Sequence, residues 1–141
     1  MSTTLITNGI QSSGNTWIQV NGGTTAINVT ASGVTTMLSL TETKVAMPAN
    51  DINLATGNYF TKTISTTTTL TVSNVPVTGT GVSFILDLTN GGSSTVTWWA
   101  GMKWASGSAP TLTTSGRDVL GFFTHDGGTT WNGLLLGKGM A

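Results

Sequence analysis

Residues 82–89 read VSFILDLT, and the alternation of apolar and polar side chains in this stretch predicts a β-strand. Successive side chains of a strand point to opposite faces, so alternate residues of the stretch share a face. The apolar face consists of Val82, Phe84, Leu86 and Leu88. Ile85 is the exception, because it is apolar among the polar residues of the other face. The pattern is typical of a strand with one buried face.

Three further strands are predicted downstream of this one. The turn residues 90–93 lead into a short alternating run at 95–98, and β-branched and aromatic residues favour strands at 119–124 and 131–136. Between the last two lies Asp126-Gly127-Gly128, where glycine supplies the positive φ angles of a tight hairpin. We therefore expect an antiparallel sheet.

Shorter strand signals precede this sheet. Pro48 disfavours a helix and a central strand, and we place a domain boundary there. Residues 51–54, 59–65 and 69–73 then alternate between turn signals. About seven short strands at this spacing predict an all-β domain of the antiparallel β-sandwich or jelly-roll type over residues 48–141.

The N-terminal part has a different pattern. Residues 1–14 are polar and lack periodicity, which indicates an arm. Alternating runs at 16–20, 24–30 and 34–41 predict a small β-meander, too thin to be stable alone. We expect residues 1–47 to anchor the chain or to intertwine with other copies of it, with packing on the main domain as the alternative.

The composition bears on the class of function. Charged residues make up 7% of the chain, five basic and five acidic, whereas threonine occurs 30 times and glycine 19 times. The basic residues are scattered, so we expect no nucleic-acid partner. An uncharged threonine-rich surface does little to prevent association, which favours a subunit of an assembly over the alternative of a monomer.

Three classes of feature are not found in the sequence. There is no cysteine, which excludes disulfides and cysteine metal sites. No stretch is apolar enough to span a membrane, and the start MSTTLIT does not resemble a signal peptide. We therefore expect synthesis in the cytoplasm as a soluble chain.

The polar side chains do not form a recognisable catalytic set. His125 beside Asp126 is the only histidine-carboxylate neighbour pair, and turn geometry explains it. Asp118 and Asp126 would approach only if their strands pair, and Arg117 offers Asp118 a local partner. We expect no catalytic residues, no cofactor and no histidine or cysteine metal site, while calcium on loop carbonyls stays open.

The tryptophans are the most distinctive side chains. Trp98, Trp99, Trp104 and Trp131 have two interpretations, a platform for sugar rings or a place in the core or an intersubunit contact. Neighbouring strand residues point to opposite faces, so we expect Trp98 and Trp99 to lie on opposite faces. The core or interface interpretation is favoured.

An ordered set of segments over roughly residues 51–141 resembles virion proteins of tailed bacteriophages. The segments are NLATGNYF (53–60), TLTVSN (69–74), FILDLTNGG (84–92), VTW (96–98) with 104–112, and DVLGFFTHDGGTTW (118–131). The resemblance implies a structural component, homotrimeric, with other virion proteins as partners. It implies no catalytic residue. The chain lacks the collagen-like or coiled-coil shaft of long fibres.

These observations together predict a non-enzymatic virion protein, made in the host cytoplasm. A short tail or baseplate fibre subunit that takes part in host-surface attachment fits best. A capsid decoration or head-fibre protein is one alternative, and a module that binds host cell-surface glycan through its tryptophans is another.

Overall fold

The structure is a computed structural model that describes residues 41–141. The chain divides into two units, Met1–Ser39 and Leu40–Ala141, and the fold below is that of the second unit. The predicted arm and the three runs of the predicted meander fall outside the described residues, apart from Thr41 at the end of the third run. Residues 41–141 contain strands and two short 3-10 turns, Gly91–Ser93 and Ala105–Gly107, and no α-helix. The predicted all-β class is confirmed.

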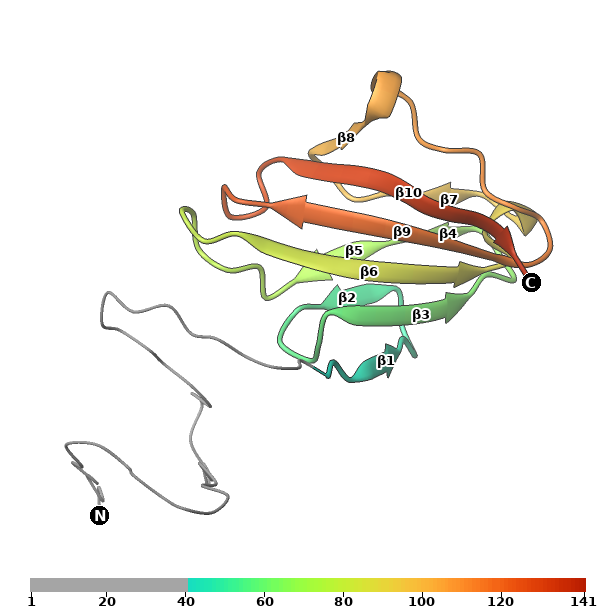
Figure 1. The fold of residues 1–141 in the computed structure, drawn as a ribbon, viewed down its shortest axis with the longest axis horizontal. Helices are drawn as coiled ribbons and strands as arrows, with labels where there is room; N and C mark the ends of the chain where they lie inside the picture. Colours follow the sequence, from blue (N-terminus) through green and yellow to red (C-terminus); the bar gives the residue numbers. More distant parts are fainter. Residues whose placement is uncertain (1–40) are drawn as a thin grey trace, which may run out of the picture. The chain divides into compact units, whose positions relative to one another are not determined.

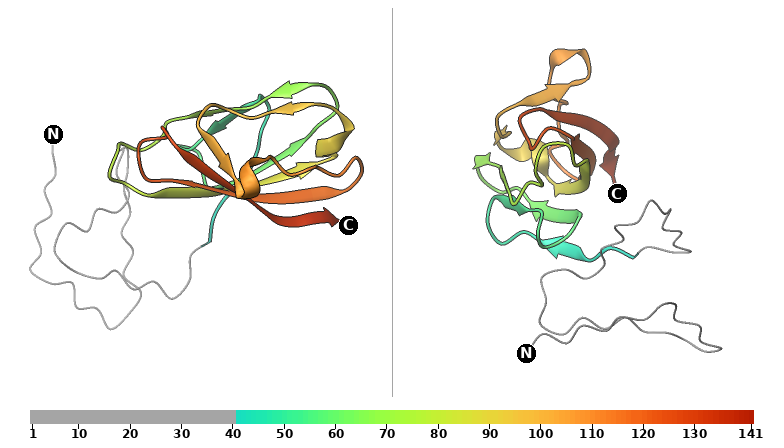
Figure 2. Two further views of the ribbon diagram at one scale, coloured as in Figure 1. Left: turned by 90° about the horizontal axis from the view of Figure 1, so that it is seen from above. Right: turned by 90° about the vertical axis from the view of Figure 1, so that its left-hand side faces the viewer.

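Ten strands make up this unit, six of them in one main sheet and the other four in two small sheets (Figure 1). They are β1 (Lys44–Ala46), β2 (Asp51–Asn53), β3 (Tyr59–Thr63), β4 (Thr68–Thr69), β5 (Thr71–Ser73), β6 (Val82–Thr89), β7 (Val96–Thr97), β8 (Met102–Trp104), β9 (Arg117–Thr124) and β10 (Trp131–Met140). The main sheet has the order β1-β3-β6-β9-β10-β8. Two two-stranded sheets, β2-β5 and β4-β7, lie on one side of it (Figure 2).

The first part of the unit is a coil of parallel strands. From β1 to β7 the chain passes back and forth between the main sheet and the small sheets, with β4 and β5 both in small sheets. Each of β1 to β4 lies parallel to a strand one turn further along. Thus β1, β3 and β6 stack side by side in the main sheet, while β2 stacks on β5 and β4 on β7. Successive turns of a coil pair in parallel because the chain crosses the other layer before it returns.

The prediction of an antiparallel sheet is therefore correct only for β6, β9 and β10. The main sheet is mixed, and the predicted strand at 95–98 is not part of it, because β7 pairs with β4 instead. Period-two alternation shows that a segment is a strand but carries no information on the direction of its partner. The sandwich or jelly-roll arrangement stays a prediction.

The hairpin between β9 and β10 is confirmed. The two strands pair antiparallel, and Gly127 and Gly128 have φ angles of 70° and 81°. The carboxylate of Asp126 accepts hydrogen bonds from the Thr124 hydroxyl and from the Thr130 amide, both at 2.9 Å. Side chain and glycine geometry together close the turn, as expected for this sequence.

The core lies between the main sheet and the two small sheets. The buried apolar residues are Met47, Ile52, Phe60, Ile64, Leu70, Phe84, Leu86, Leu88, Leu120, Phe122 and Trp131. Phe84 stacks on Phe122 with ring centroids 5.1 Å apart. The apolar face predicted for 82–89 is thus the inner face of β6, with Phe84, Leu86 and Leu88 buried in the core and Val82 partly buried against it.

The beginning of the unit precedes the predicted boundary at Pro48. β1 pairs with β3, and the amide of Met47 donates to the carbonyl of Thr61 at 3.0 Å. Residues 44–47 therefore contribute to the main sheet. The division into residues 1–47 and 48–141 as functional parts stays a prediction.

Candidate assembly surface

Within residues 41–141, the outer face of the main sheet is the face on which no second layer of strands packs. Strand pairing defines its rows of side chains. One row is Ser83-Phe123-Asn132, the next is Lys44-Tyr59-Ile85-Gly121-Leu134, and the third is Ala46-Thr61-Asp87-Val119-Gly137. A last row is Thr63-Thr89-Arg117-Met140. Every second residue of β6 and β9 lies on this face, and the alternate residues form the core.

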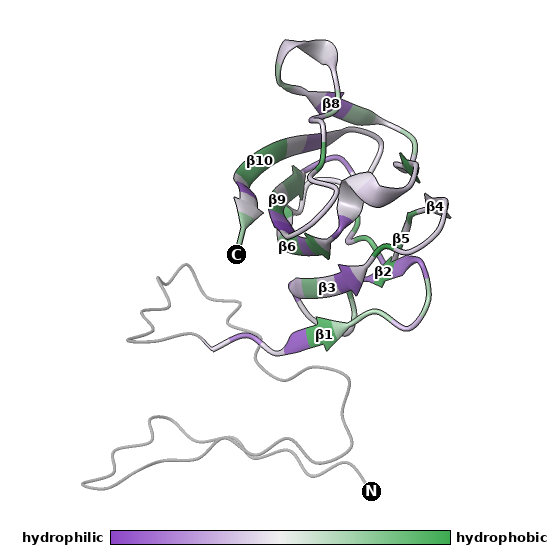
Figure 3. Ribbon diagram, turned by 90° about the vertical axis from the view of Figure 1, so that its right-hand side faces the viewer, coloured by the Kyte–Doolittle hydropathy of each residue, from purple (hydrophilic) through white to green (hydrophobic). Residues whose placement is uncertain are grey.

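Apolar side chains gather on this face over β9 and β10. The exposed fraction is 43% for Phe123, 46% for Leu134 and 56% for Leu136. Gly121 lies between them, and a Cβ atom there would approach the Cδ1 atom of Leu136 to 3.1 Å. We call Phe123, Leu134 and Leu136 with Gly121 the outer apolar patch. Green segments on β9 and β10 in Figure 3 mark this part of the sheet.

A hollow of about 220 Å³ borders the outer apolar patch on the side of β6. Ile85, Gly121, Phe123 and Leu134 line its apolar part, and Glu42 and Asn58 line its polar rim. The amide of Asn58 donates to the Glu42 carboxylate at 3.3 Å. An apolar depression with a polar rim has the composition of a protein interface.

Polar side chains occupy the other part of the face, over β3, β6 and the start of β9. Arg117 donates to the Asp87 carboxylate through Nε at 3.2 Å and forms an ion pair through Nη2 at 3.0 Å. The Tyr59 hydroxyl donates to the same carboxylate at 3.3 Å. Burial raises the pKa of Tyr59 above its ordinary value, and the negative charge of Asp87 raises it further.

Arg117 is therefore not the partner of Asp118, contrary to the expectation from their adjacency. Consecutive strand residues point to opposite faces, so Arg117 lies outside and Asp118 inside. Asp118 is fully buried, and its carboxylate accepts hydrogen bonds from the amide of Thr113, the hydroxyl of Thr113 and the amide of Gly139. Burial alone would raise the pKa of Asp118, but these hydrogen bonds hold the pKa below its ordinary value.

Asp118 and Asp126 do not form a carboxylate pair. Asp118 lies near the beginning of β9, and Asp126 follows the end of the same strand. The strand from Asp118 to Thr124 alone spans about 20 Å, well beyond the separation that glycoside hydrolysis uses. Asp126 serves the hairpin turn, and its hydrogen bonds from Thr130 lower the pKa of its carboxyl. The exposed His125 precedes it in the same turn.

The four tryptophans lie together against the core. Trp131 is 1% exposed, and Trp98, Trp99 and Trp104 are partly buried and pack on the core cluster. Phe122 is the common neighbour of three of them, with ring centroids 5.7 Å from Trp98, 4.9 Å from Trp99 and 5.7 Å from Trp104. Trp131 contacts Trp99 edge to face at 5.8 Å. Aromatic contacts of this kind stabilise a core. No flat row of exposed indoles is formed by these four residues.

Trp98 and Trp99 do not lie on opposite faces, contrary to the prediction. β7 ends at Thr97, so neither tryptophan is in a strand. Their rings contact each other edge to face at 5.9 Å, and both rings contact Phe122. The alternation rule holds only within a regular strand, and the turn at Ala100 and Gly101 changes the direction of the chain here.

The outer apolar patch was not predicted, although two signals in the sequence indicate it. Ile85 interrupts the polar face of residues 82–89, and Leu134, Leu135 and Leu136 are consecutive. Three consecutive apolar residues in a strand place apolar side chains on both faces. Leu134 lies on the outer face, and Leu135 pairs with the buried Leu120 on the inner one.

Within residues 41–141, no three His, Asp or Glu side chains come together in a way that would hold a metal ion. In the same part of the chain, no helix has the length and apolar character needed to cross a membrane. Comparison of the chain with protein-family models, with curated proteins and with solved structures finds no match.

Proposed function

We propose that the protein is a non-enzymatic structural subunit that assembles into a homotrimer through the outer apolar patch. The observation that carries this proposal is the exposure of Phe123, Leu134 and Leu136, which lie around Gly121 on one sheet face. Soluble monomers rarely leave such a contiguous apolar surface in water. Contact with identical copies covers it.

The energetics favour association. Full burial of a leucine or phenylalanine side chain contributes about 1.5–3 kcal/mol. Phe123, Leu134 and Leu136 are about half exposed, so association adds roughly half of that for each, before the entropy of association is subtracted. The chain carries five basic and five acidic residues, and its net charge is zero. Electrostatic repulsion between copies is consequently weak.

The place of this assembly is a virion of a tailed bacteriophage. The support is the resemblance of segments within residues 51–141 to virion structural proteins. We propose a short tail or baseplate fibre subunit, in which residues 1–47 anchor the chain to other virion proteins and residues 48–141, with a sandwich-like arrangement, are displayed. Display on the capsid as a decoration or head-fibre protein would use the same trimer. Both roles make the particle the site of action.

Light scattering coupled to size-exclusion chromatography tests the assembly. We expect the wild-type chain to have three times the 14.5 kDa mass of one chain at micromolar concentration. Leu134→Lys places a charge within the outer apolar patch and should shift the mass to that of a monomer. A wild-type monomer would contradict the proposal.

Val77→Lys is the matched control. Val77 is 78% exposed and lies in the loop between β5 and β6, outside the outer apolar patch. The same chemical change there should leave the mass unchanged. If Val77→Lys dissociates the oligomer as completely as Leu134→Lys does, the outer apolar patch is not the specific interface.

The virion assignment has its own test. Purified phage particles that encode the chain should contain it by mass spectrometry, and density for residues 48–141 should be found in an electron-microscopy map of the particle. Density at the tail or baseplate supports a fibre, and density on the head supports decoration. Absence of the chain from purified particles would overturn the virion role.

A further inference from the structure

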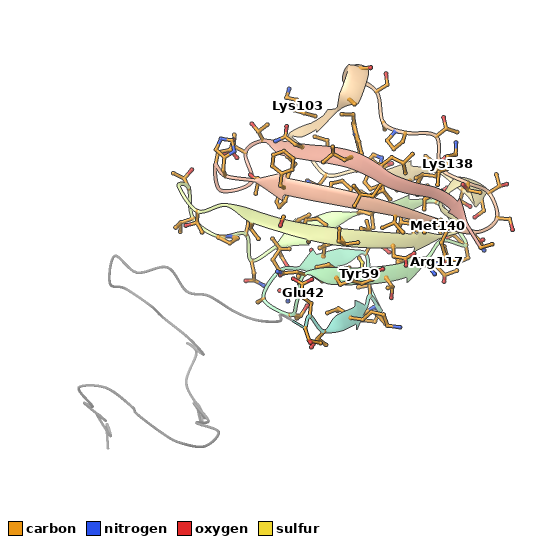
Figure 4. All side chains as sticks on the ribbon, viewed as in Figure 1. Glu42, Tyr59, Lys103, Arg117, Lys138 and Met140 are labelled. Carbon is orange, nitrogen blue, oxygen red and sulfur yellow. The ribbon has the colours of Figure 1, made fainter. Side chains whose placement is uncertain are left out.

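A second hollow lies on the outer face of the main sheet, over β1, β3, β6 and the beginning of β9. Its volume is about 370 Å³. It is lined by Lys44, Tyr59, Thr61, Asp87, Thr89 and Arg117. Figure 4 labels Tyr59 and Arg117 in this part of the sheet, and Lys103 at the opposite edge. We call it the polar hollow.

Charge is concentrated in the polar hollow. The whole chain has ten ionic side chains, and Lys44, Asp87 and Arg117 line this one depression. Within the described part of the chain, the only ion pair joins Arg117 to Asp87, so Lys44 has no carboxylate partner there. The balance of one acidic and two basic groups leaves the polar hollow with a net positive charge.

The geometry holds Arg117 ready for a second acceptor. Asp87 accepts from Nε at 3.2 Å and pairs with Nη2 at 3.0 Å, which fixes one edge of the planar guanidinium. A guanidinium has five N–H groups, and the remaining ones stay available. The Tyr59 hydroxyl donates to Asp87 at 3.3 Å from the other side, so the carboxylate is held between β3 and β9. Arg117 thus offers free N–H groups beside a fixed acceptor, and Lys44 lines the same hollow from the β1 side.

We propose that the polar hollow binds a saccharide that carries a carboxylate, such as a hexuronic acid residue. Arg117 would bind the carboxylate, and Lys44 would add a positive charge from the β1 side of the hollow. The hydroxyls of Thr61 and Thr89 would exchange hydrogen bonds with the hydroxyls of the sugar ring. The volume lies in the range of small-molecule sites. This inference goes beyond the proposed assembly and does not depend on it.

The charge pattern argues for a carboxylate over a phosphate. Asp87 forms the floor of the polar hollow and is buried, so it repels a dianion more strongly than a monoanion. A nucleic acid would need a longer array of cations than the two present here. The hydroxyl side chains add donors and acceptors that a simple anion would not use but a sugar ring does.

The proposal is tested by titrating the full-length chain with matched ligands. Binding is measured by isothermal calorimetry and by amide chemical shifts. Glucuronate and glucose differ in the group at C6, a carboxylate in one and a hydroxymethyl in the other, and acetate supplies the carboxylate without the ring. We expect glucuronate to bind, and glucose and acetate each to bind more weakly by on the order of tenfold or more. Glucose lacks the charge-assisted contact of the carboxylate, and acetate lacks the contacts of the sugar ring.

Variants locate the site. Lys44→Gln and Arg117→Gln should each weaken glucuronate binding on the order of tenfold, while Lys103→Gln, an exposed cation outside the polar hollow, should leave it unchanged. Because Arg117→Gln removes the partner of Asp87, thermal unfolding of each variant is measured in parallel. Lys44 is exposed on an edge strand, so Lys44→Gln keeps the test valid if Arg117→Gln is unstable.

Three outcomes would overturn the proposal: no binding of glucuronate, equal binding of glucose, or binding of acetate as tight as that of glucuronate. The last result would identify a simple anion site. The mass of the chain is measured on the same samples. A trimer without glucuronate binding refutes the sugar site alone, and a monomer that binds glucuronate refutes the assembly alone.

Discussion

Replacing Asp118 with Asn removes the charge of a buried carboxylate without a large change in volume. The Oδ1 atom of Asp118 accepts from the Thr113 hydroxyl at 2.7 Å and from the Gly139 amide at 2.9 Å, and Oδ2 accepts from the Thr113 amide at 2.5 Å. These bonds fasten the loop before β9 and the end of β10 to one side chain. An asparagine keeps one acceptor oxygen and turns its NH₂ group toward a donor.

The expected cost follows from these contacts. Hydrogen bonds to a charged group contribute about 1.5–3 kcal/mol, and a buried donor left without a partner costs about 1–3 kcal/mol. Asp118→Asn removes the charge from the hydrogen bonds that Oδ1 accepts. It also replaces Oδ2 by an NH₂ group, so that the buried amide of Thr113 has no acceptor. We expect the free energy of unfolding to fall by about 3 kcal/mol at pH 7. For a domain of this size that corresponds to a decrease in Tm of roughly 10–20 °C.

The effect should depend on pH. The pKa of Asp118 in the folded chain lies below its ordinary value of 3.8, so the ionised carboxylate stabilises the fold above that pH. This contribution is lost as the pH falls through the folded pKa. The difference in stability between the wild type and Asp118→Asn should therefore be largest near neutral pH and should shrink below about pH 3.8.

Urea unfolding followed by tryptophan fluorescence, from pH 7 to pH 3, measures both quantities. Glu42→Gln serves as the control, because Glu42 is exposed and accepts one long hydrogen bond from Asn58 at 3.3 Å. That variant should change stability by less than about 0.5 kcal/mol. A loss below about 1 kcal/mol for Asp118→Asn at pH 7, or a loss that does not vary with pH, would refute this account of the carboxylate.

Three further predictions concern the core and the polar hollow. Gly133→Ala should destabilise the fold by about 1–3 kcal/mol in urea unfolding, because its Cβ would lie 2.5 Å from the Trp104 ring. The control is Gly81→Ala, which should leave the stability unchanged because the space around Gly81 is open. Phe84→Ala should cost about 3–5 kcal/mol in the same assay, since this ring stacks on Phe122 at 5.1 Å; a cost below 1 kcal/mol would contradict its central place. Tyr59 is the only tyrosine of the chain, so ultraviolet titration should show one phenol with a pKa above 10.0. In Asp87→Asn this pKa should lie closer to 10.0. The stability of the wild type should decline as the pH rises through the pKa of the folded chain. A wild-type phenol that titrates at or below 10.0 would refute the contact.

The strands that could be predicted are those with a strong local signal. Residues 82–89 became β6 with the same bounds, and Asp126-Gly127-Gly128 became the hairpin between β9 and β10. Both signals depend only on neighbouring residues in the sequence. The strand is indicated by the alternation of its side chains, and the hairpin by the backbone freedom of its glycines. β1 and β8 were missed, because three residues are too few to show a period.

The candidate sites depend on contacts between residues far apart in the sequence, and the side-chain partners predicted for them were wrong in two cases. Arg117 pairs with Asp87, 30 residues away, and not with its neighbour Asp118. The tryptophans at 98 and 99 share one aromatic cluster because the strand before them ends early. Adjacency in the sequence says little about adjacency in space once a chain changes direction.

The use of strands, the place of the clearest hairpin and the scarcity of charge all follow from the amino-acid sequence. These properties arise from side-chain chemistry and from local backbone freedom. The parallel direction of β1, β3 and β6, and the division of the outer face of one sheet between apolar and ionic residues, arise only when the chain folds. Strand direction and register are set by which segments bury their apolar faces together, and that choice is made by the whole chain at once.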